Sequence, residues 1–481
     1  MSIELKNKLL GLLEKVGQEH VLRFWQQLDP AGQQRLAAQI LSVDWQQCRR
    51  WIEDALQEEA PELPFERLQP SPYQPLAVES AAEQAFQRDC IAQGEELLRQ
   101  GRLAAFTVAG GQGSRLGFDG PKGTYAFTAL RKASLFQFFA ESLLRYQEIY
   151  QTLLPWYIMT SPANDQATRE FFAHNGFFGL DPAHVSFFQQ GTLPAFDLQG
   201  KALLEAPDSL ALSANGHGGS FAALKDSGAL EDMRRRGVQL LSYWQVDNPL
   251  VRLFDPLFIG MHALSGSEMS SRALLKRDPL EKLGHFCTLD GRELIVEYSD
   301  MPEELLYAKD KQGRLLYRAG SPAIHLLNCD FIATLCSGSL NFKPHRALKK
   351  VPCIDERGRR CEPERENAIK LEFFLFDALP LARKTLVLEA ERSEQFAPIK
   401  NAEGEDSPES CRQALLERSA GWVEAAGLEF PRDAEGKPAA LLEVSPRHSV
   451  DRDDFLRRAE KPSGLTCGAK LVFGDERFFG H

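Results

Sequence analysis

The sequence predicts an α/β fold with a mixed, mainly parallel central sheet. Between about residues 100 and 395, short apolar runs alternate with stretches of helical periodicity, the pattern of strands joined by covering helices. The strand candidates are 103–108, 155–161, 185–190, 238–246 and 384–390, and 134–150 is a helix candidate among them. A glycine-rich stretch joins the first strand to that helix, and ligands in open α/β sheets bind at the carboxyl ends of strands.

Three regions follow along the chain. Residues 1–98 carry apolar residues at helical spacing, interrupted by a proline-rich stretch at 60–75, which predicts an N-terminal helical region. Residues 99–395 form the predicted α/β domain. Residues 396–481 combine one helix candidate, 407–427, with short segments, which predicts a small C-terminal α+β region.

Composition excludes several classes of function. A net charge of -11 argues against nucleic-acid binding. The first 20 residues lack the apolar core of a signal peptide, and no uninterrupted apolar run is long enough for a membrane span. Nine scattered cysteines without a CxxC pair fit reduced thiols in a cytoplasmic protein and no zinc site. Any metal is therefore expected to be bound through oxygen.

The stretch 108–123, VAGGQGSRLGFDGPKG, contains six glycines between the strand and the helix. Glycines at that place let the backbone approach a phosphate or a base, and exposed N–H groups bind anions. Arg115 and Lys122 add positive charge to the same loop. A purely structural turn would need only one or two glycines, so we expect a ligand-binding loop.

Two common phosphate-binding loops do not match this stretch. A Walker A loop requires a lysine directly after a glycine in a register that is missing here. The dinucleotide pattern G-x-G-x-x-G fails because Gly111 and Gly113 are followed by Leu116, with the glycine one place late at Gly117. An NAD-dependent oxidoreductase is therefore disfavoured.

The loop closely resembles the signature of the UDP-sugar pyrophosphorylases, in particular the eukaryotic-type UDP-N-acetylglucosamine pyrophosphorylases. Six further blocks match that family in the same order: FFQQGTLPA (187–195), GHGG (216–219), VDNPL (246–250), VEYSD (296–300), IKLEFFLFD (369–377) and FAPIKNAEG (396–404). Together the seven blocks cover about residues 100 to 425. The resemblance implies a Rossmann-like nucleotide-diphospho-sugar transferase fold in which 99–395 is the catalytic domain.

The reaction that the resemblance implies joins UTP and a sugar 1-phosphate into a UDP-sugar and releases pyrophosphate, with Mg²⁺ as cofactor. A sugar phosphate is already a dianion near neutral pH, so it needs no general base. The reaction instead needs in-line positioning and positive charge between two polyanions. This requirement explains why no His/Asp or Cys/His dyad stands out in the sequence.

The resemblance also assigns roles to individual residues. It implies that Ala109, Gly110 and Gly111 hold the uridine, that Gln190 and Gly216 contact uracil, and that Asp247 binds Mg²⁺ at the α-phosphate. Arg115, Lys122 and Lys400 are the implied catalytic cations, and Lys370 is a further phosphate-binding cation. The implied sugar contacts are Gly284 and Glu297, with Phe374 and Phe376 near the N-acetyl pocket.

Three of these assignments have structural alternatives. Gln190 in FFQQG is also compatible with a capping residue, and Asp247 in VDN with a helix cap or an Asx turn. Phe374 and Phe376 are equally compatible with core positions.

Two positions depart from the N-acetylglucosamine pattern. His217 and Ser321 stand where those enzymes have asparagine, and a histidine after glycine is similar instead to UDP-glucose and broad-specificity UDP-sugar pyrophosphorylases. The nature of the sugar therefore stays open between an N-acetylglucosamine, a glucose and a multi-sugar enzyme. A catalytically silent sugar-nucleotide sensor is the alternative of another class, and it would be favoured by loss of a cation or of the metal carboxylate. We expect small-molecule partners only, with neither nucleic acid nor membrane, and a monomer or homodimer.

Overall fold

A computed structural model describes residues 2–57, 63–338, 342–458 and 460–474. These residues form two compact units. Unit 1 consists of the segments 1–66, 190–222 and 341–377, and unit 2 of the segments 67–189, 223–340 and 378–481. The short helix α7 (Ser220–Asp226) begins in the first unit and ends in the second. Each unit is described by itself below.

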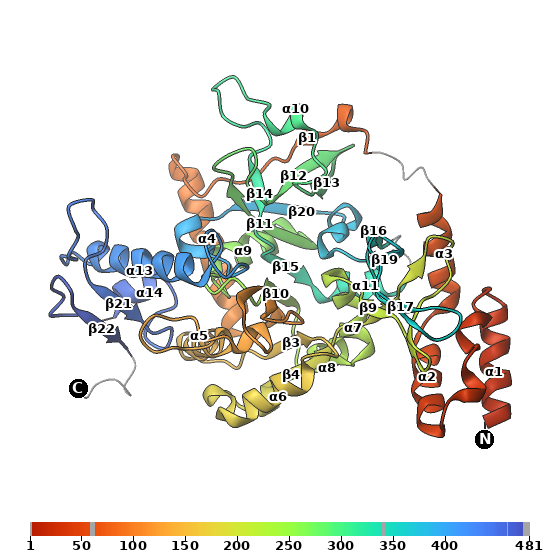
Figure 1. Cartoon of the computed structure of the whole chain (residues 1–481). Coiled ribbons are helices and arrows are strands. Elements are labelled where there is room, and N and C mark those ends of the chain that lie inside the picture. The colour runs from red at the N-terminus through yellow and green to blue at the C-terminus, as the bar shows by residue number, and fades with distance from the viewer. Residues whose placement is uncertain (1, 58–62, 339–341, 459, 475–481) are drawn as a thin grey trace. The chain divides into compact units, whose positions relative to one another are not determined.

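Unit 2 is built on a sheet of eleven strands in the described chain. The strand order is β1-β12-β14-β11-β15-β10-β2-β3-β4, with β13 beside β12 and β20 beside β11. In Figure 1 these strands run from β12 and β14 at the top to β3 and β4 at the bottom. Their bounds are β1 Gln69–Pro70, β2 Leu103–Val108, β3 Trp156–Thr160, β4 Val185–Gln189, β10 Leu240–Gln245, β11 Met269–Leu275, β12 Gly284–Leu289, β13 Arg292–Val296, β14 Ala319–Ser321, β15 His325–Asn328 and β20 Thr385–Glu389.

The strand directions place one end of several strands together. β10, β2, β3 and β4 are parallel neighbours, and β20 lies parallel to β11. β15 is antiparallel to both β10 and β11, which makes the sheet mixed. The carboxyl ends of β10, β2, β3 and β4 consequently lie at the same edge. The predicted α/β fold with a mixed central sheet is confirmed, and all five strand candidates are strands.

Helices cover this sheet and carry apolar faces into its core. Their bounds are α4 Ala81–Arg99, α5 Leu135–Tyr150, α6 Asp165–His174, α8 Ala229–Arg235, α9 Pro256–Ser265, α10 Glu303–Leu306, α11 Cys329–Cys336, α12 Arg392–Gln395, α13 Pro408–Ala425 and α14 Arg452–Arg457. α5 begins where the sequence predicts, because the Ser134 hydroxyl accepts the Gln137 N–H at 3.1 Å as an N-cap. Phe136 and Phe139 of α5 are fully buried and contact Trp156 and Trp244 of the sheet.

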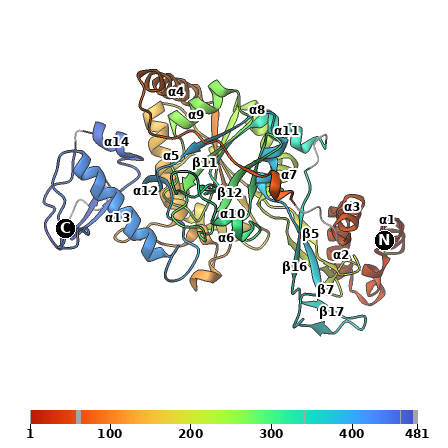
Figure 2. The ribbon, with the colours of Figure 1, turned by 90° about the horizontal axis from the view of Figure 1, so that it is seen from above.

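α4 and α9 cross at very short range, and Figure 1 and Figure 2 both show them side by side. A Cβ atom on Gly94 would overlap the carbonyl of Pro256, and one on Gly260 would overlap the carbonyl of Cys90. The close approach of the two backbones therefore requires glycine on both helices.

The C-terminal part of unit 2 forms a small α+β layer. Two strands, β21 (Leu441–Val444) and β22 (Lys470–Phe473), pair in parallel, and α13 packs beside β21. Ser407 caps α13 by accepting the Ser410 N–H at 3.2 Å. The helix candidate 407–427 is thereby confirmed.

Unit 1 combines three helices with small sheets. The bounds are α1 Ser2–Glu14, α2 Pro30–Ser42, α3 Trp45–Leu56, β5 Thr192–Pro194, β6 Phe196–Asp197, β7 Leu204–Ala206, β8 Ser209–Leu210, β9 Leu212–Ala214, β16 His345–Lys349, β17 Cys353–Ile354, β18 Arg360–Cys361 and β19 Ala368–Glu372. The strands pair as β16-β19-β6, β17-β18, β5-β9 and β7-β8. Leu9, Leu13 and Trp45 of the helices share one core with Ile369 and Leu371 of β19.

The compact units do not coincide with the three regions expected from the sequence. α4 belongs to the predicted N-terminal region but packs on α9 within unit 2. The division at residues 98 and 395 into separate domains stays a prediction.

Candidate functional site

The glycine-rich loop follows β2 at the shared carboxyl edge of the sheet. Its two ends come together, because the Lys122 N–H donates to the Gly111 carbonyl at 3.0 Å and the Gly113 N–H to the Gly120 carbonyl at 2.9 Å. Gly117, with φ of 66°, ends the short 3₁₀ helix η4 (Ser114–Leu116). The loop is thus a closed structure that returns Lys122 to the strand end.

Gly111 has no packing reason to be glycine. Its φ is not positive, and a Cβ atom added to it would meet nothing within 4 Å. The space beside it is open, as expected where a ligand comes close to the backbone. Gly123 is different, because a Cβ atom there would overlap the Phe136 ring.

Asn164 holds the loop from the neighbouring strand, and sequence reasoning missed it. It follows β3, is 1% exposed, and donates from Nδ2 to the carbonyls of Ala109 at 2.9 Å and Gly111 at 3.3 Å. Its Oδ1 accepts the Ser161 N–H at 2.8 Å. The available signal was its place just after a strand parallel to β2, at the same sheet edge.

Lys122 and Asp247 are brought together at that edge. Asp247 lies two residues beyond β10, and its Oδ2 is 3.9 Å from Lys122 Nζ. Both side chains are 14% exposed. Lys122 Nζ also donates to the Ile399 carbonyl at 3.4 Å. Among the described residues no backbone N–H donates to the Asp247 carboxylate, so the alternative of a capping aspartate is not what the structure has.

Lys400 reaches the same edge from a distant part of the sequence. The Ile399 N–H donates to the Asp247 carbonyl at 2.8 Å, which fixes the residue before Lys400 next to Asp247. Lys400 Nζ lies 3.4 Å from the Asp406 carboxylate. The third predicted catalytic cation, Arg115 on η4, is exposed and has no ion pair among the described residues.

The implied sugar contacts of unit 2 lie on two paired strands. Gly284 at the start of β12 is the register partner of Ser321 at the end of β14. A Cβ atom on Gly284 would overlap Ile295 Cγ2 at 2.6 Å and would lie in ordinary contact with Glu297 Oε1 at 3.6 Å, so Gly284 lies close to that carboxylate. The structure therefore groups Gly284, Glu297 and Ser321.

A buried lysine–histidine pair supports these strands, and it too was missed. Successive residues of a strand face opposite sides, so His285 and Gly320 lie on the face opposite to Gly284 and Ser321. Lys276 Nζ donates to His285 Nε2 at 2.8 Å, and His285 Nδ1 donates to the Tyr317 carbonyl at 2.9 Å. Burial lowers the pKa of Lys276 to about 8 and that of His285 to about 4.

The implied uracil contacts of unit 1 contact each other directly. Gln190 Nε2 donates to the Gly216 carbonyl at 2.6 Å, so this glutamine bridges two loops and does not cap a helix. Gly216 has φ of 82°, and a Cβ atom on it would overlap the Phe373 carbonyl. The Gly218 N–H donates to that carbonyl at 2.8 Å. Glycine is therefore required at Gly216 both by the conformation and by the close approach.

His217 is held in one protonation state. Its Nδ1 accepts the Leu375 N–H at 3.1 Å, and burial lowers its pKa to about 4. The neutral ring consequently carries its proton on Nε2 and offers a single hydrogen-bond donor. Phe374 and Phe376 stack on each other and lie 5.6 and 5.8 Å from the imidazole, centroid to centroid. Both phenylalanines are only partly buried, so they are not simple core residues.

Lys370 lies on β19 opposite Ala347 and is partly buried. The six predicted residues of unit 1 are Gln190, Gly216, His217, Lys370, Phe374 and Phe376, and the remaining predicted residues belong to unit 2. Among the described residues no group of three or more His, Cys, Asp or Glu side chains could hold a metal ion by itself. No helix in the described part of the chain is long and apolar enough to cross a membrane.

Comparison with known proteins assigns the chain to a family. The model of the UDPGP family, described as UTP–glucose-1-phosphate uridylyltransferase, matches residues 52–480. The chain belongs to the UDPGP family. The resemblance to UDP-sugar pyrophosphorylases found in the sequence is thereby confirmed.

Members of the UDPGP family similar to this chain include two curated proteins. UDP-N-acetylhexosamine pyrophosphorylase-like protein 1 of Homo sapiens is 37% identical, and the match covers 90% of this chain and 91% of that protein. UDP-N-acetylglucosamine pyrophosphorylase of Saccharomyces cerevisiae is 36% identical, with 91% and 94% covered.

Solved structures agree with the family assignment. The uridine diphosphate N-acetylglucosamine pyrophosphorylase from Trypanosoma brucei is 25% identical, with a TM-score of 0.79 and 94% of each chain covered. A UDP-glucose pyrophosphorylase from Leishmania major is 14% identical, with a TM-score of 0.61 and 89% and 87% covered, which shows the shared fold alone.

Proposed function

We propose that this UDPGP family member transfers the uridylyl group of UTP to a sugar 1-phosphate and releases pyrophosphate. One observation carries the proposal: Lys122, Asp247 and the segment before Lys400 contact one another at the sheet edge that also holds Gly111. The space beside Gly111 is open to a ligand. A loop that leaves backbone open next to two lysines and one carboxylate suits a triphosphate. Loss of a cation or of the carboxylate would have favoured a silent sensor, and all of them are present.

In the proposed reaction an oxygen of the sugar phosphate attacks the α-phosphorus in line. The bond from the α-phosphorus to the oxygen that it shares with the β-phosphorus breaks, and pyrophosphate leaves with that oxygen. The attacking group is already a dianion, so the chain supplies positioning and positive charge and no general base. Lys122, Lys400 and Arg115 supply that charge, and Lys370 is assigned to phosphate binding. Ala109, Gly110, Gly111, Gln190 and Gly216 are assigned to the uridine.

The cofactor that we propose is Mg²⁺, held by Asp247. Mg²⁺ commonly binds one or two protein carboxylates together with substrate phosphates, so a single aspartate whose side chain is still partly accessible fits it. When bound, the ion would offset negative charge on the α-phosphate. Lys122 Nζ lies 3.9 Å from the Asp247 carboxylate, so a positive charge already faces this carboxylate without substrate.

The sugar is the finer part of the proposal. His217 presents one N–H donor, and Ser321 has a single hydroxyl oxygen for donating and accepting, whereas an asparagine at either place would offer a separate N–H donor and carbonyl acceptor. This favours a site that tolerates a 2-hydroxyl as well as an N-acetyl group, so a UDP-glucose or broad-specificity enzyme is the runner-up to an N-acetylglucosamine enzyme. Gly284, Glu297, Phe374 and Phe376 complete the proposed sugar contacts.

A pyrophosphate-release assay with UTP, Mg²⁺ and a panel of sugar 1-phosphates tests the proposal. N-acetylglucosamine, glucose and galactose 1-phosphates are expected to differ in rate, and at least one must release pyrophosphate in proportion to UDP-sugar. Binding of UTP without turnover on any sugar would support the sensor instead. We further propose a cytoplasmic location, because all nine cysteines are free thiols. We also propose that the protein is a monomer or a homodimer.

A further inference from the structure

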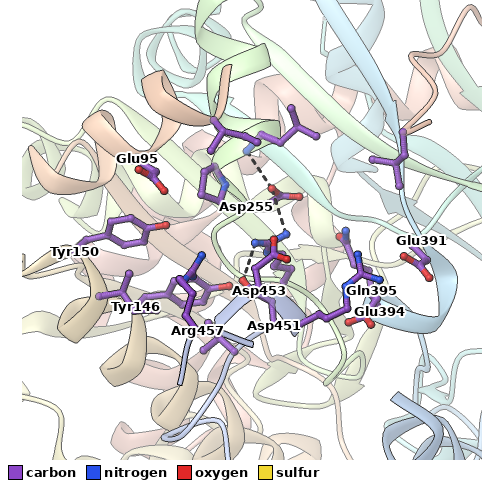
Figure 3. A pocket seen from close by; sticks show the side chains of 18 residues that line it. Glu95, Tyr146, Tyr150, Asp255, Glu391, Glu394, Gln395, Asp451, Asp453 and Arg457 are labelled. Atoms are coloured by element: carbon purple, nitrogen blue, oxygen red, sulfur yellow. Dashed lines mark hydrogen bonds and ion pairs between the residues drawn. The ribbon is translucent and has the colours of Figure 1, made fainter. Parts of the chain in front are cut away.

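A cavity of about 230 Å³ lies in unit 2 and contains none of the residues assigned to the reaction. α4, α5, the segment from Arg252 to Leu257, α12 and the start of α14 enclose it (Figure 3). Nothing in the proposed reaction accounts for a polar cavity at this place.

Acidic groups outnumber basic ones along the wall. Six carboxylates line the cavity, namely Glu95, Asp255, Glu391, Glu394, Asp451 and Asp453, against the three guanidinium groups of Arg252, Arg452 and Arg457. Arg252 is already engaged by Asp451 at 2.6 Å and Asp255 at 3.6 Å. Glu391 and Asp453 have no ion pair among the described residues. Burial raises the pKa of Glu394, although Arg418 lies near its carboxylate and the Trp422 indole N–H donates to it at 3.0 Å.

Two buried hydrogen-bonding oxygens on the wall lack a partner among the described residues. They are the Tyr146 hydroxyl and Gln395 Oε1, on residues that are 2% and 6% exposed. Figure 3 shows the hydroxyls of Tyr146 and Tyr150 both directed toward the middle of the cavity. Unpaired buried polar atoms are costly, so these oxygens indicate a ligand that donates hydrogen bonds. Arg252 Nε, a donor, is the one unpaired wall atom that such a ligand would not satisfy.

The wall suits an ammonium group better than a metal ion. An ammonium offers three donors and no acceptor, which complements carboxylates, an amide oxygen and phenol oxygens. The carboxylates do not converge as metal ligands do, because no group of three in the described chain could hold a metal ion.

The rest of the wall is apolar, and Ile91, Ile149, Leu257 and Val450 supply aliphatic surface to it. Figure 3 shows Glu95 at one side of the cavity and Glu391 and Glu394 at the other. A ligand with two amines joined by a short methylene chain matches this distribution. We propose that the cavity is an effector site for a short aliphatic diamine.

The cavity is connected to the reacting edge by hydrogen bonds, and the effector role rests on the proposed function. Gln395, on the wall, accepts Asn248 Nδ2 through its carbonyl at 2.9 Å, and Asn248 Oδ1 accepts the Ala397 N–H at 3.1 Å. Asn248 directly follows Asp247, whose carbonyl holds Ile399 before Lys400. A ligand that shifts α12 would therefore change the distance between Lys400 and Asp247.

Calorimetric titration of the whole protein with putrescine at physiological salt tests the site. Putrescine should bind saturably, and butylamine, which has one charge, should bind at least about tenfold more weakly. The double variant Glu391→Gln with Asp453→Asn should weaken putrescine binding by about three- to tenfold, as for two exposed charges. The exposed pair Glu356→Gln with Glu435→Gln changes the net charge equally and should leave binding unchanged.

Tyr146→Phe removes the unpaired hydroxyl and keeps the ring. It should weaken putrescine binding while the melting temperature stays equal or rises, because the hydroxyl is unsatisfied in the free protein. Absence of saturable heat, or equal weakening in the acidic variant and its surface control, would overturn the site.

Steady-state kinetics test the effector role. Saturating putrescine should change kcat/KM for UTP at least about twofold in the parent and not in the Glu391→Gln, Asp453→Asn variant. Binding without any kinetic change overturns the effector role. A protein with no turnover at all would contradict the proposed function, whereas calorimetry still decides the diamine site.

Discussion

Replacing Lys122 by alanine removes the charge closest to the carboxylate at the reacting edge. Lys122 Nζ lies 3.9 Å from Asp247, and its side chain is 14% exposed. At about 4 Å, two unit charges interact by about 1 kcal/mol in water and about 4 kcal/mol at an effective dielectric constant near 20. Because both side chains are largely buried, the interaction energy of Lys122 with Asp247 should lie between these two values. Loss of one preorganised group of this kind typically costs about 10²–10³ in turnover.

The expected loss of turnover should leave stability nearly intact. The ion pair with Asp247 is long at 3.9 Å, so its loss should lower the free energy of unfolding by about 1 kcal/mol, at the low end of that range. Pyrophosphate release at saturating UTP measures turnover, and thermal unfolding measures stability. Lys311→Ala, at an exposed lysine, is the matched control and should behave as the parent. Turnover within about threefold of the parent would refute the role given to Lys122.

Three further predictions concern the metal, the sugar and pH. Asp247→Asn keeps the shape but not the charge, so turnover should fall and require far more Mg²⁺, and an unchanged Mg²⁺ titration would place the ligand elsewhere. His217→Asn with Ser321→Asn should shift kcat/KM toward N-acetylglucosamine 1-phosphate over glucose 1-phosphate; a parent that already discriminates by more than about a thousandfold would contradict this. His262 is buried, and burial lowers its pKa to about 4. The unfolded chain then binds its proton first as pH falls from about 6.5, so His262 alone should lower the free energy of unfolding by up to about 1.4 kcal/mol per pH unit between pH 6.5 and 4. His262→Gln should reduce the slope by that amount in denaturant titrations, and an equal slope in the variant would contradict this role of His262.

Five strands of the main sheet were predicted because they are buried runs with clear boundaries, whereas β1 and β11 to β15 of the same sheet were not among the candidates. LAAFTV corresponds to β2 without error, and the helix candidate after the glycine loop is α5 with its serine cap. The short strands of unit 1 were not predicted. Strands such as β6 and β8 are too short to show an alternation of apolar and polar residues, and they depend on distant pairing partners.

The candidate site was predictable only where a motif marks it. Lys122, Asp247 and Lys400 were found through motif blocks, but the hydrogen bond that fixes Ile399 to Asp247 joins residues far apart in sequence. Asn164 and Lys276 were not predicted, because each acts through a contact made across strands. Asn164 donates to the carbonyls of Ala109 and Gly111, and Lys276 donates to His285. No local composition distinguishes such residues from ordinary polar ones.

The shared core of α1, α3 and β19 imposes an order on synthesis. Leu9 and Trp45 leave the ribosome early, yet Ile369 and Leu371, which complete their core, follow more than about 300 residues later. At about 5–20 residues per second this interval lasts roughly 15–60 s. Until then the helices, together with Phe196 and Leu210 of the same core, lack the strand that completes it. We therefore expect a chain truncated before β19 to leave part of this apolar surface exposed.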